Sequence, residues 1–71
     1  MTARQTIIKT AAAKTATDRK NGEHIGNGLL KKNMLIAAKQ TGHWNYWMNM
    51  TEAQKTRAMT EILRKSQVAG F

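Results

Sequence analysis

The densest apolar run of the chain lies in residues 29–41, LLKKNMLIAAKQT. At about 100° per residue, apolar side chains cover most of the circumference of a helix through this run, and three lysines are its only charged residues. A helix of that kind is usually covered on more than one side. We therefore predict that residues 29–41 form the central and most buried helix. The predicted inward side carries Leu29, Leu30, Met34, Ile36, Ala37, Ala38 and Thr41.

Residues 52–69 have the clearest pattern of a helix with one apolar face. Thr51 and Gln54 have the spacing of a capping box, in which each side chain bonds the backbone N–H of the other residue. Glu61 and Lys65 have the spacing of a helical ion pair. Gly70 is placed to end the helix, and we expect Phe71 to fold back on its last turn. The predicted apolar arc consists of Ala58, Met59, Ile62, Leu63, Ser66 and Ala69.

Residues 4–20 predict a helix with a thin apolar face. Only Ile7 and Ile8 on that face have large side chains, and Ala11, Ala12 and Thr15 complete it. Alanine buries little apolar area, so we expect this helix to be loosely held and to fray at its N-terminus. The alternative is a basic arm that becomes ordered on a partner.

Two breaks separate these helices. Residues 21–28, NGEHIGNG, contain three glycines, of which Gly22 suits the left-handed position after a helix, and Ile25 is expected to pin the loop to the core. Gly42 ends the middle helix, and residues 43–49 have the spacing of one further helical turn. The sequence therefore predicts a single all-α domain with three main helices, over residues 4–20, 29–41 and 52–69. In this interpretation residues 29–71 hold the core.

Composition narrows the class of protein. Of the 71 residues none is cysteine or proline, which excludes disulfides and thiolate metal sites and favours uninterrupted helices. The absence of cysteine fits a cytoplasmic protein. No apolar stretch is long enough to be a transmembrane segment. The net charge is +8, which makes a polyanion the natural partner.

An enzyme is not expected. The four acids lie far apart in the sequence, and no pair has an acid–base arrangement. His24 and His43 have no second ligand at helical spacing, so we expect no metal site and no cofactor.

Nucleic acid is the predicted partner, because phosphate contacts from Lys and Arg require no particular motif. Every predicted helix carries some of these cations, so they are dispersed along the chain rather than gathered in one patch, which weakens this prediction. The candidate nucleic-acid-binding residues are Arg4, Lys9, Lys14, Arg19, Lys20, Lys32, Lys39, Arg57 and Arg64, with Lys31 and Lys65 as neighbours.

A more specific hypothesis is a helix-turn-helix unit. Ala38 and Gly42 have the spacing of its turn, and the following helix would present Asn45 and Asn49 to a groove. Trp44 and Trp47 would crowd so short a recognition helix.

The main alternative is a protein-binding inhibitor or adaptor of the phage- or plasmid-accessory type. Trp, Tyr and Met are enriched in the cores of protein interfaces, and residues 43–50 concentrate them. A third reading is a cationic membrane-active peptide. Partner, oligomeric state and sequence specificity stay open. The candidate protein-interface residues are His43, Trp44, Tyr46, Trp47 and Met50.

Overall fold

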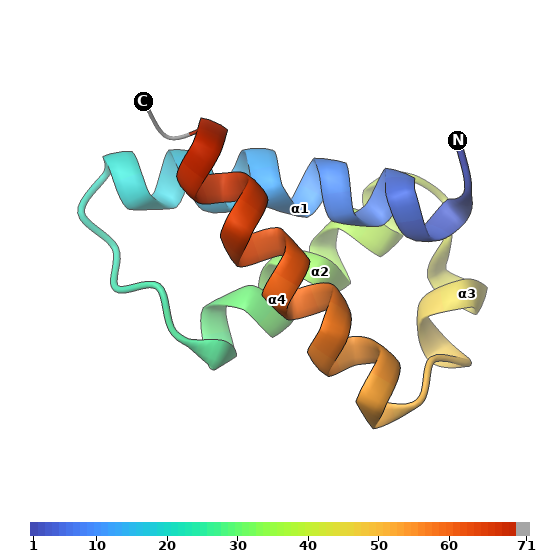
Figure 1. The fold of residues 1–71 in the computed structure, drawn as a ribbon. Coiled ribbons are helices and arrows are strands. Elements are labelled where there is room, and N and C mark those ends of the chain that lie inside the picture. Colours follow the sequence, from blue (N-terminus) through green and yellow to red (C-terminus); the bar gives the residue numbers. More distant parts are fainter. Residues whose placement is uncertain (70–71) are drawn as a thin grey trace.

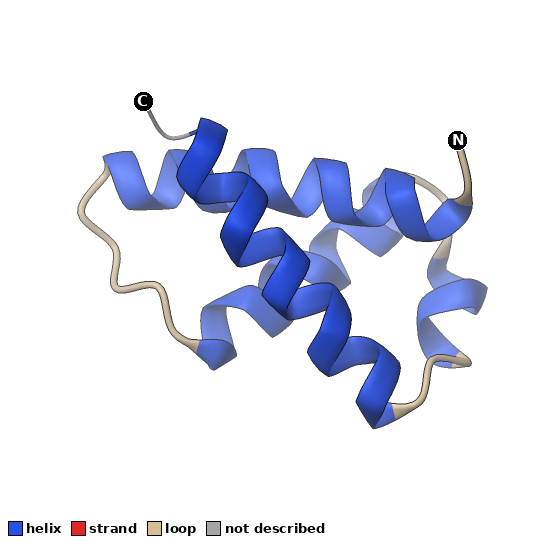
Figure 2. Cartoon of the chain, viewed as in Figure 1, coloured by secondary structure: helices blue, strands red, loops and turns tan. Residues whose placement is uncertain are grey.

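The computed structural model describes the backbone of residues 1–69 and the side chains of residues 1–67. Over that range the chain forms four α-helices and no strand, which confirms the all-α prediction (Figure 1, Figure 2). Figure 1 shows α4 crossing α1 and α2, with α3 to one side in the link between α2 and α4. The helices are α1, Ala3–Lys20; α2, Asn27–Gln40; α3, Trp44–Met48; and α4, Glu52–Ala69.

α1 has defined bonds at both ends. Thr2 Oγ1 accepts a bond from the Gln5 N–H at 3.2 Å, and Gln5 Oε1 accepts one from the Thr2 N–H at 2.9 Å. This capping box satisfies two of the backbone N–H groups that a helix start leaves free. At the other end Gly22 has a φ of +85°, the left-handed conformation predicted for it.

α1 is part of the core rather than an arm beside it. Its face with Ile7, Ile8, Ala11, Ala12 and Thr15 is buried, as the pattern predicts. The helix lies against both α2 and α4. The predicted division into a basic segment and a core over residues 29–71 therefore places too little of the core in α1.

α2 is more buried than α1, because five of its 14 residues are buried, against five of 18 in α1. Its inward side differs from the predicted one. Leu30, Met34, Ala37 and Ala38 are buried as expected, but Leu29, Ile36 and Thr41 are only half-buried. The centre of the buried side is taken by a polar residue, Asn33, which is completely buried.

α4 follows its predicted pattern. Thr51 and Gln54 form the expected capping box, with bonds of 3.1 and 2.8 Å. Ala58, Ile62 and Ser66 are buried, while Met59 and Leu63 pack against the core from its edge. The predictions for the side chain of Ala69 and for Gly70 and Phe71 lie outside the described residues.

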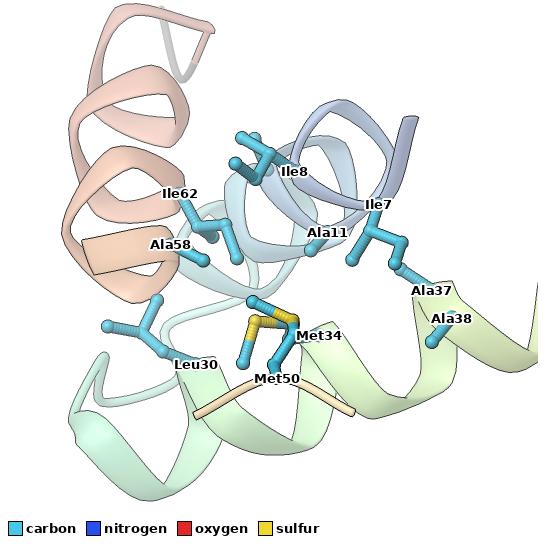
Figure 3. Packing of buried hydrophobic residues seen from close by; sticks show 11 residues of the cluster. Ile7, Ile8, Ala11, Leu30, Met34, Ala37, Ala38, Met50, Ala58 and Ile62 are labelled. Carbon is cyan, nitrogen blue, oxygen red and sulfur yellow. The ribbon is translucent and has the colours of Figure 1, made fainter. Parts of the chain in front are cut away.

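The core forms where α1, α2 and α4 meet (Figure 3). Ile8 of α1 points toward Ile62 of α4, whereas Ile7 points toward Ala37 of α2, and Met34 of α2 lies below them. Alanines at the remaining contacts allow the helices to approach closely, because the distance between helix axes is set by the side chains between them. Ile25 packs against this core from the first loop, as predicted.

Candidate binding surfaces

Most of the carboxylates form ion pairs with Lys or Arg side chains of the same molecule. Arg4 pairs with Glu61 at 2.8 Å, and Lys14 pairs with Asp18 at 3.4 Å. Glu52 lies 3.9 Å from both Lys31 and Lys55. Three of the four acidic residues therefore have a cationic partner, and Glu23 in the exposed first loop is the fourth.

The basic residues divide into engaged and unengaged groups. Of the twelve Lys and Arg residues, four take part in those ion pairs, and Arg19 donates a bond to Ser66 at 3.2 Å. Arg19 Nε is buried as well, so the guanidinium faces α4. Arg19 was predicted to contact phosphate, but this position turns it away from the surface that would do so. Besides Arg19, seven cations pair with no carboxylate in the described part of the chain: Lys9, Lys20, Lys32, Lys39, Arg57, Arg64 and Lys65.

Two of these cations converge on one surface hollow. Lys9 of α1 and Lys65 of α4 both line a depression of about 690 Å³, together with Gln5, Ala12 and Ala13. The small side chains leave the depression open. The α1–α4 groove, defined by these residues, is thus bordered by cations from two helices that lie far apart in the sequence.

A second surface is built by α3. The rings of Trp44 and Trp47 are stacked, with centroids 5.3 Å apart and planes inclined by 19°. Trp44 is 36% exposed, and its neighbours Tyr46 and Met48 are 38% and 56% exposed. We call Trp44, Tyr46, Trp47 and Met48 the α3 aromatic patch.

Two lysines border this patch. The Lys39 ammonium lies 5.1 Å from the centroid of the Trp44 ring, and the Lys55 ammonium lies 4.1 Å from that of Trp47. Because Trp47 occupies one face of Trp44, an ammonium centred over Trp44 takes the other face. The order is therefore Lys39, Trp44, Trp47, Lys55, with a cation at each end of the stacked rings.

The two tryptophans have different surroundings. Trp47 packs against the core, and its Nε1 is buried without a hydrogen-bond partner in the described structure. Trp44 lies on the outer side of the stack. Trp47 therefore anchors the patch to the core, and Trp44 is the tryptophan that a partner can contact.

Two predicted interface residues have other roles. Met50 is only 8% exposed and belongs to the core, so its assignment to a surface interface was wrong (Figure 3). Met50 follows the end of α3, and its side chain turns inward beside Met34 of α2. His43 precedes α3 as its half-buried N-cap residue.

The structure contains the turn of a helix-turn-helix unit but not a recognition helix of sufficient length. Gly42 does form the turn, with a φ of +77°. The helix after it has five residues, which is too short to lie along a major groove and place several side chains on base edges. Asn45 and Asn49 are exposed, but Asn49 Nδ2 donates to the Asn45 carbonyl at 2.8 Å.

Some surface residues were not recognised from the sequence. Lys55 was missed because it follows Trp47 by eight residues, across a change of helix, so no helical spacing relates them. Met48 carried a signal that was passed over, since it lies four residues after the exposed Trp44 and shares its side of a helical turn. Asn33 gave no signal of its burial, because amide side chains are usually exposed.

In residues 1–67 no three His, Asp or Glu side chains gather in a way that would hold a metal ion. None of the helices described is long and apolar enough to cross a membrane. Comparison with protein families, curated proteins and solved structures finds no match to this chain.

Proposed function

We propose that this protein binds nucleic acid without catalysing a reaction, in a regulatory or accessory role. The observation that carries the proposal is the division of charges. Three of the four carboxylates are engaged by internal partners, while seven cations are not. A surface with that excess attracts phosphate backbones, and each phosphate contact releases counterions.

The α1–α4 groove brings two of the unpaired cations to one hollow of the surface. Lys9 and Lys65 border it, and Arg64 is the residue next to Lys65. Arg57 lies seven residues before Arg64, so the two share the outer side of α4. The absence of cysteine also fits a reducing compartment, and the proposal places the protein in the cytoplasm.

Replacing the two groove lysines tests the proposal. Lys9→Gln combined with Lys65→Gln removes two unpaired cations and should lower affinity for a labelled oligonucleotide by roughly ten- to hundredfold at low salt. Fluorescence anisotropy measures this directly. Unchanged affinity of the double variant would contradict the location of the site, and no binding by the native chain would contradict the function.

A matched control exchanges a pair that is already engaged. Arg4→Glu with Glu61→Arg keeps the net charge at +8 and allows the ion pair to form in the opposite sense. This variant should bind the oligonucleotide as the native chain does. It separates the effect of particular unpaired lysines from a general effect of altering the α1–α4 surface.

The second candidate is a protein-binding inhibitor or adaptor, and the exposed α3 aromatic patch favours it. Exposed Trp and Tyr side chains often dominate the binding energy of protein interfaces. Binding of that kind depends little on salt, whereas phosphate contacts weaken steeply as salt rises. Capture of a partner that survives high salt and is lost in Trp44→Ala would favour this candidate over nucleic acid.

A further inference from the structure

The exposed Lys39 side chain lies over the outer face of Trp44. Trp47 holds the inner face, and the Lys39 ammonium lies 5.1 Å from the ring centroid on the outer one. Lys39 is exposed and pairs with no carboxylate in residues 1–67. The attraction of an exposed ammonium to a ring is weaker than the stacking of a base on tryptophan. A base can therefore displace Lys39 from the ring.

The geometry of α3 decides which form of nucleic acid the ring can meet. A helix of five residues is about 7 Å long, and Trp44 and Tyr46 are its exposed aromatic side chains. In a duplex the base faces are stacked on one another and are closed to such a ring. In a single strand they are open.

We propose that the α3 aromatic patch binds single-stranded nucleic acid. An unpaired base stacks on the outer face of Trp44 in the place of the Lys39 ammonium, which moves to the adjacent phosphate. This inference rests on the proposed function and names its substrate class. It adds to the α1–α4 groove a second contact, one that distinguishes single strands from duplexes.

The charges around the patch favour a polyanion over a protein as its occupant. Lys39 and Lys55 lie at the two ends of the stacked rings, and Lys31 lies 3.9 Å from Glu52 beside them. Glu52 also lies 3.9 Å from Lys55, so the one carboxylate near the patch is matched by two lysines. Tyr46 offers a further exposed ring for a neighbouring base.

The test compares a short single strand with the duplex of the same sequence by fluorescence anisotropy. The native chain should bind the single strand at least roughly tenfold more tightly. Trp44→Leu keeps an apolar side chain but removes the aromatic face, and it should lower single-strand affinity by roughly tenfold or more while leaving duplex affinity unchanged. Trp44→Phe keeps a stacking face and should retain most of the single-strand affinity.

Tryptophan fluorescence supplies a second readout, because a base stacked on Trp44 quenches its emission. The circular dichroism of each variant checks that it is folded, since Trp44 also packs on Trp47. Equal affinity for single strand and duplex, with no effect of Trp44→Leu, would overturn this inference and leave the proposed function standing. No binding of either form would overturn both. A protein captured through Trp44 at high salt would assign the patch to a protein partner and overturn the inference.

Discussion

Asn33 brings a carboxamide into the centre of the helix interface. Its Nδ2 donates to Thr15 Oγ1 at 2.9 Å and to Asp18 Oδ2 at 3.0 Å. Thr15 in turn donates to the Ala11 carbonyl at 2.8 Å, so its oxygen is an acceptor toward Asn33. Asn33 Oδ1 has no partner in the described structure. The amide therefore ties α2 to α1 through its two N–H groups alone, and it fixes how the two helices are turned toward each other.

Asn33→Asp tests this role without a change of size. The new oxygen would face Asp18 where an N–H now donates, and an uncompensated buried charge costs about 3–5 kcal/mol. One of two adjacent carboxyls binds a proton more readily in the folded variant than in the unfolded chain. The cost is therefore full at neutral pH and decreases as the pH falls. The measurement is the unfolding temperature of the variant relative to that of the native chain, at neutral and at acidic pH. The difference should be smaller at acidic pH.

Asn27→Asp is the matched control. The same chemical change here falls on an exposed residue in the first turn of α2, where no acidic residue is present. A negative charge at that end of a helix is favourable by about 0.3–1 kcal/mol. If Asn33→Asp unfolded at the same temperature as this control at neutral pH, the role given to Asn33 would be wrong.

Contacts between individual side chains were harder to predict from the sequence than the bounds of the helices. Spacing along the helix predicts that Glu61 pairs with Lys65, but the structure pairs Glu61 with Arg4. Partners in the same helix follow from the sequence, whereas partners in another helix depend on how the helices cross. The burial of Asn33 was missed for the same reason, because its partners Thr15 and Asp18 belong to α1.

The helices themselves end in ways that the sequence does specify. At the end of α1 the Glu23 N–H bonds the Asp18 carbonyl at 2.9 Å, and at the end of α2 the His43 N–H bonds the Ala38 carbonyl, also at 2.9 Å. Each is the long bond of a Schellman motif, which needs a residue of positive φ just before its donor. Gly22 and Gly42 supply those residues, with φ of +85° and +77°.

Gly42→Ala should destabilise the protein by about 1–2 kcal/mol, the cost of a left-handed conformation for a residue with a Cβ. No atom lies within 4 Å of that Cβ, so the cost is one of backbone conformation and not of crowding. Gly28→Ala is the contrasting variant, because Gly28 lies in the first turn of α2 with equal space and no positive φ. It should stabilise by up to about 0.5–1 kcal/mol. Denaturant midpoints compare the two, and destabilisation by both would contradict this account.

Most element boundaries were predictable because caps and glycines are local signals. The start of α1 was predicted to within one residue, but its capping box was not recognised, although Thr2 and Gln5 have the same spacing as Thr51 and Gln54. The thin face of α1 suggested loose attachment. That interpretation considered the area of Ile7 and Ile8 but not the close approach that Ala11 and Ala12 permit.

On the scale of the whole molecule, the total charge can be counted from the sequence, whereas the arrangement of the charges depends on the fold. Lys9 and Lys65 are far apart in the chain and border one groove, because α1 and α4 lie side by side. Arg4, Lys14 and Arg19 were predicted as phosphate contacts and instead have partners within the fold. The candidate site is therefore partly different from the predicted one, while its character as a cationic surface is unchanged.

The central claim is that the unpaired cations bind a phosphate backbone. The most direct test is the salt dependence of the association constant of the native chain with a single-stranded oligonucleotide. Each neutralised phosphate contributes about −0.7 to the slope of log K against log salt concentration. Between three and all seven of the unpaired cations would give a slope of roughly −2 to −5. A slope near zero, or no association at low salt, would contradict the account.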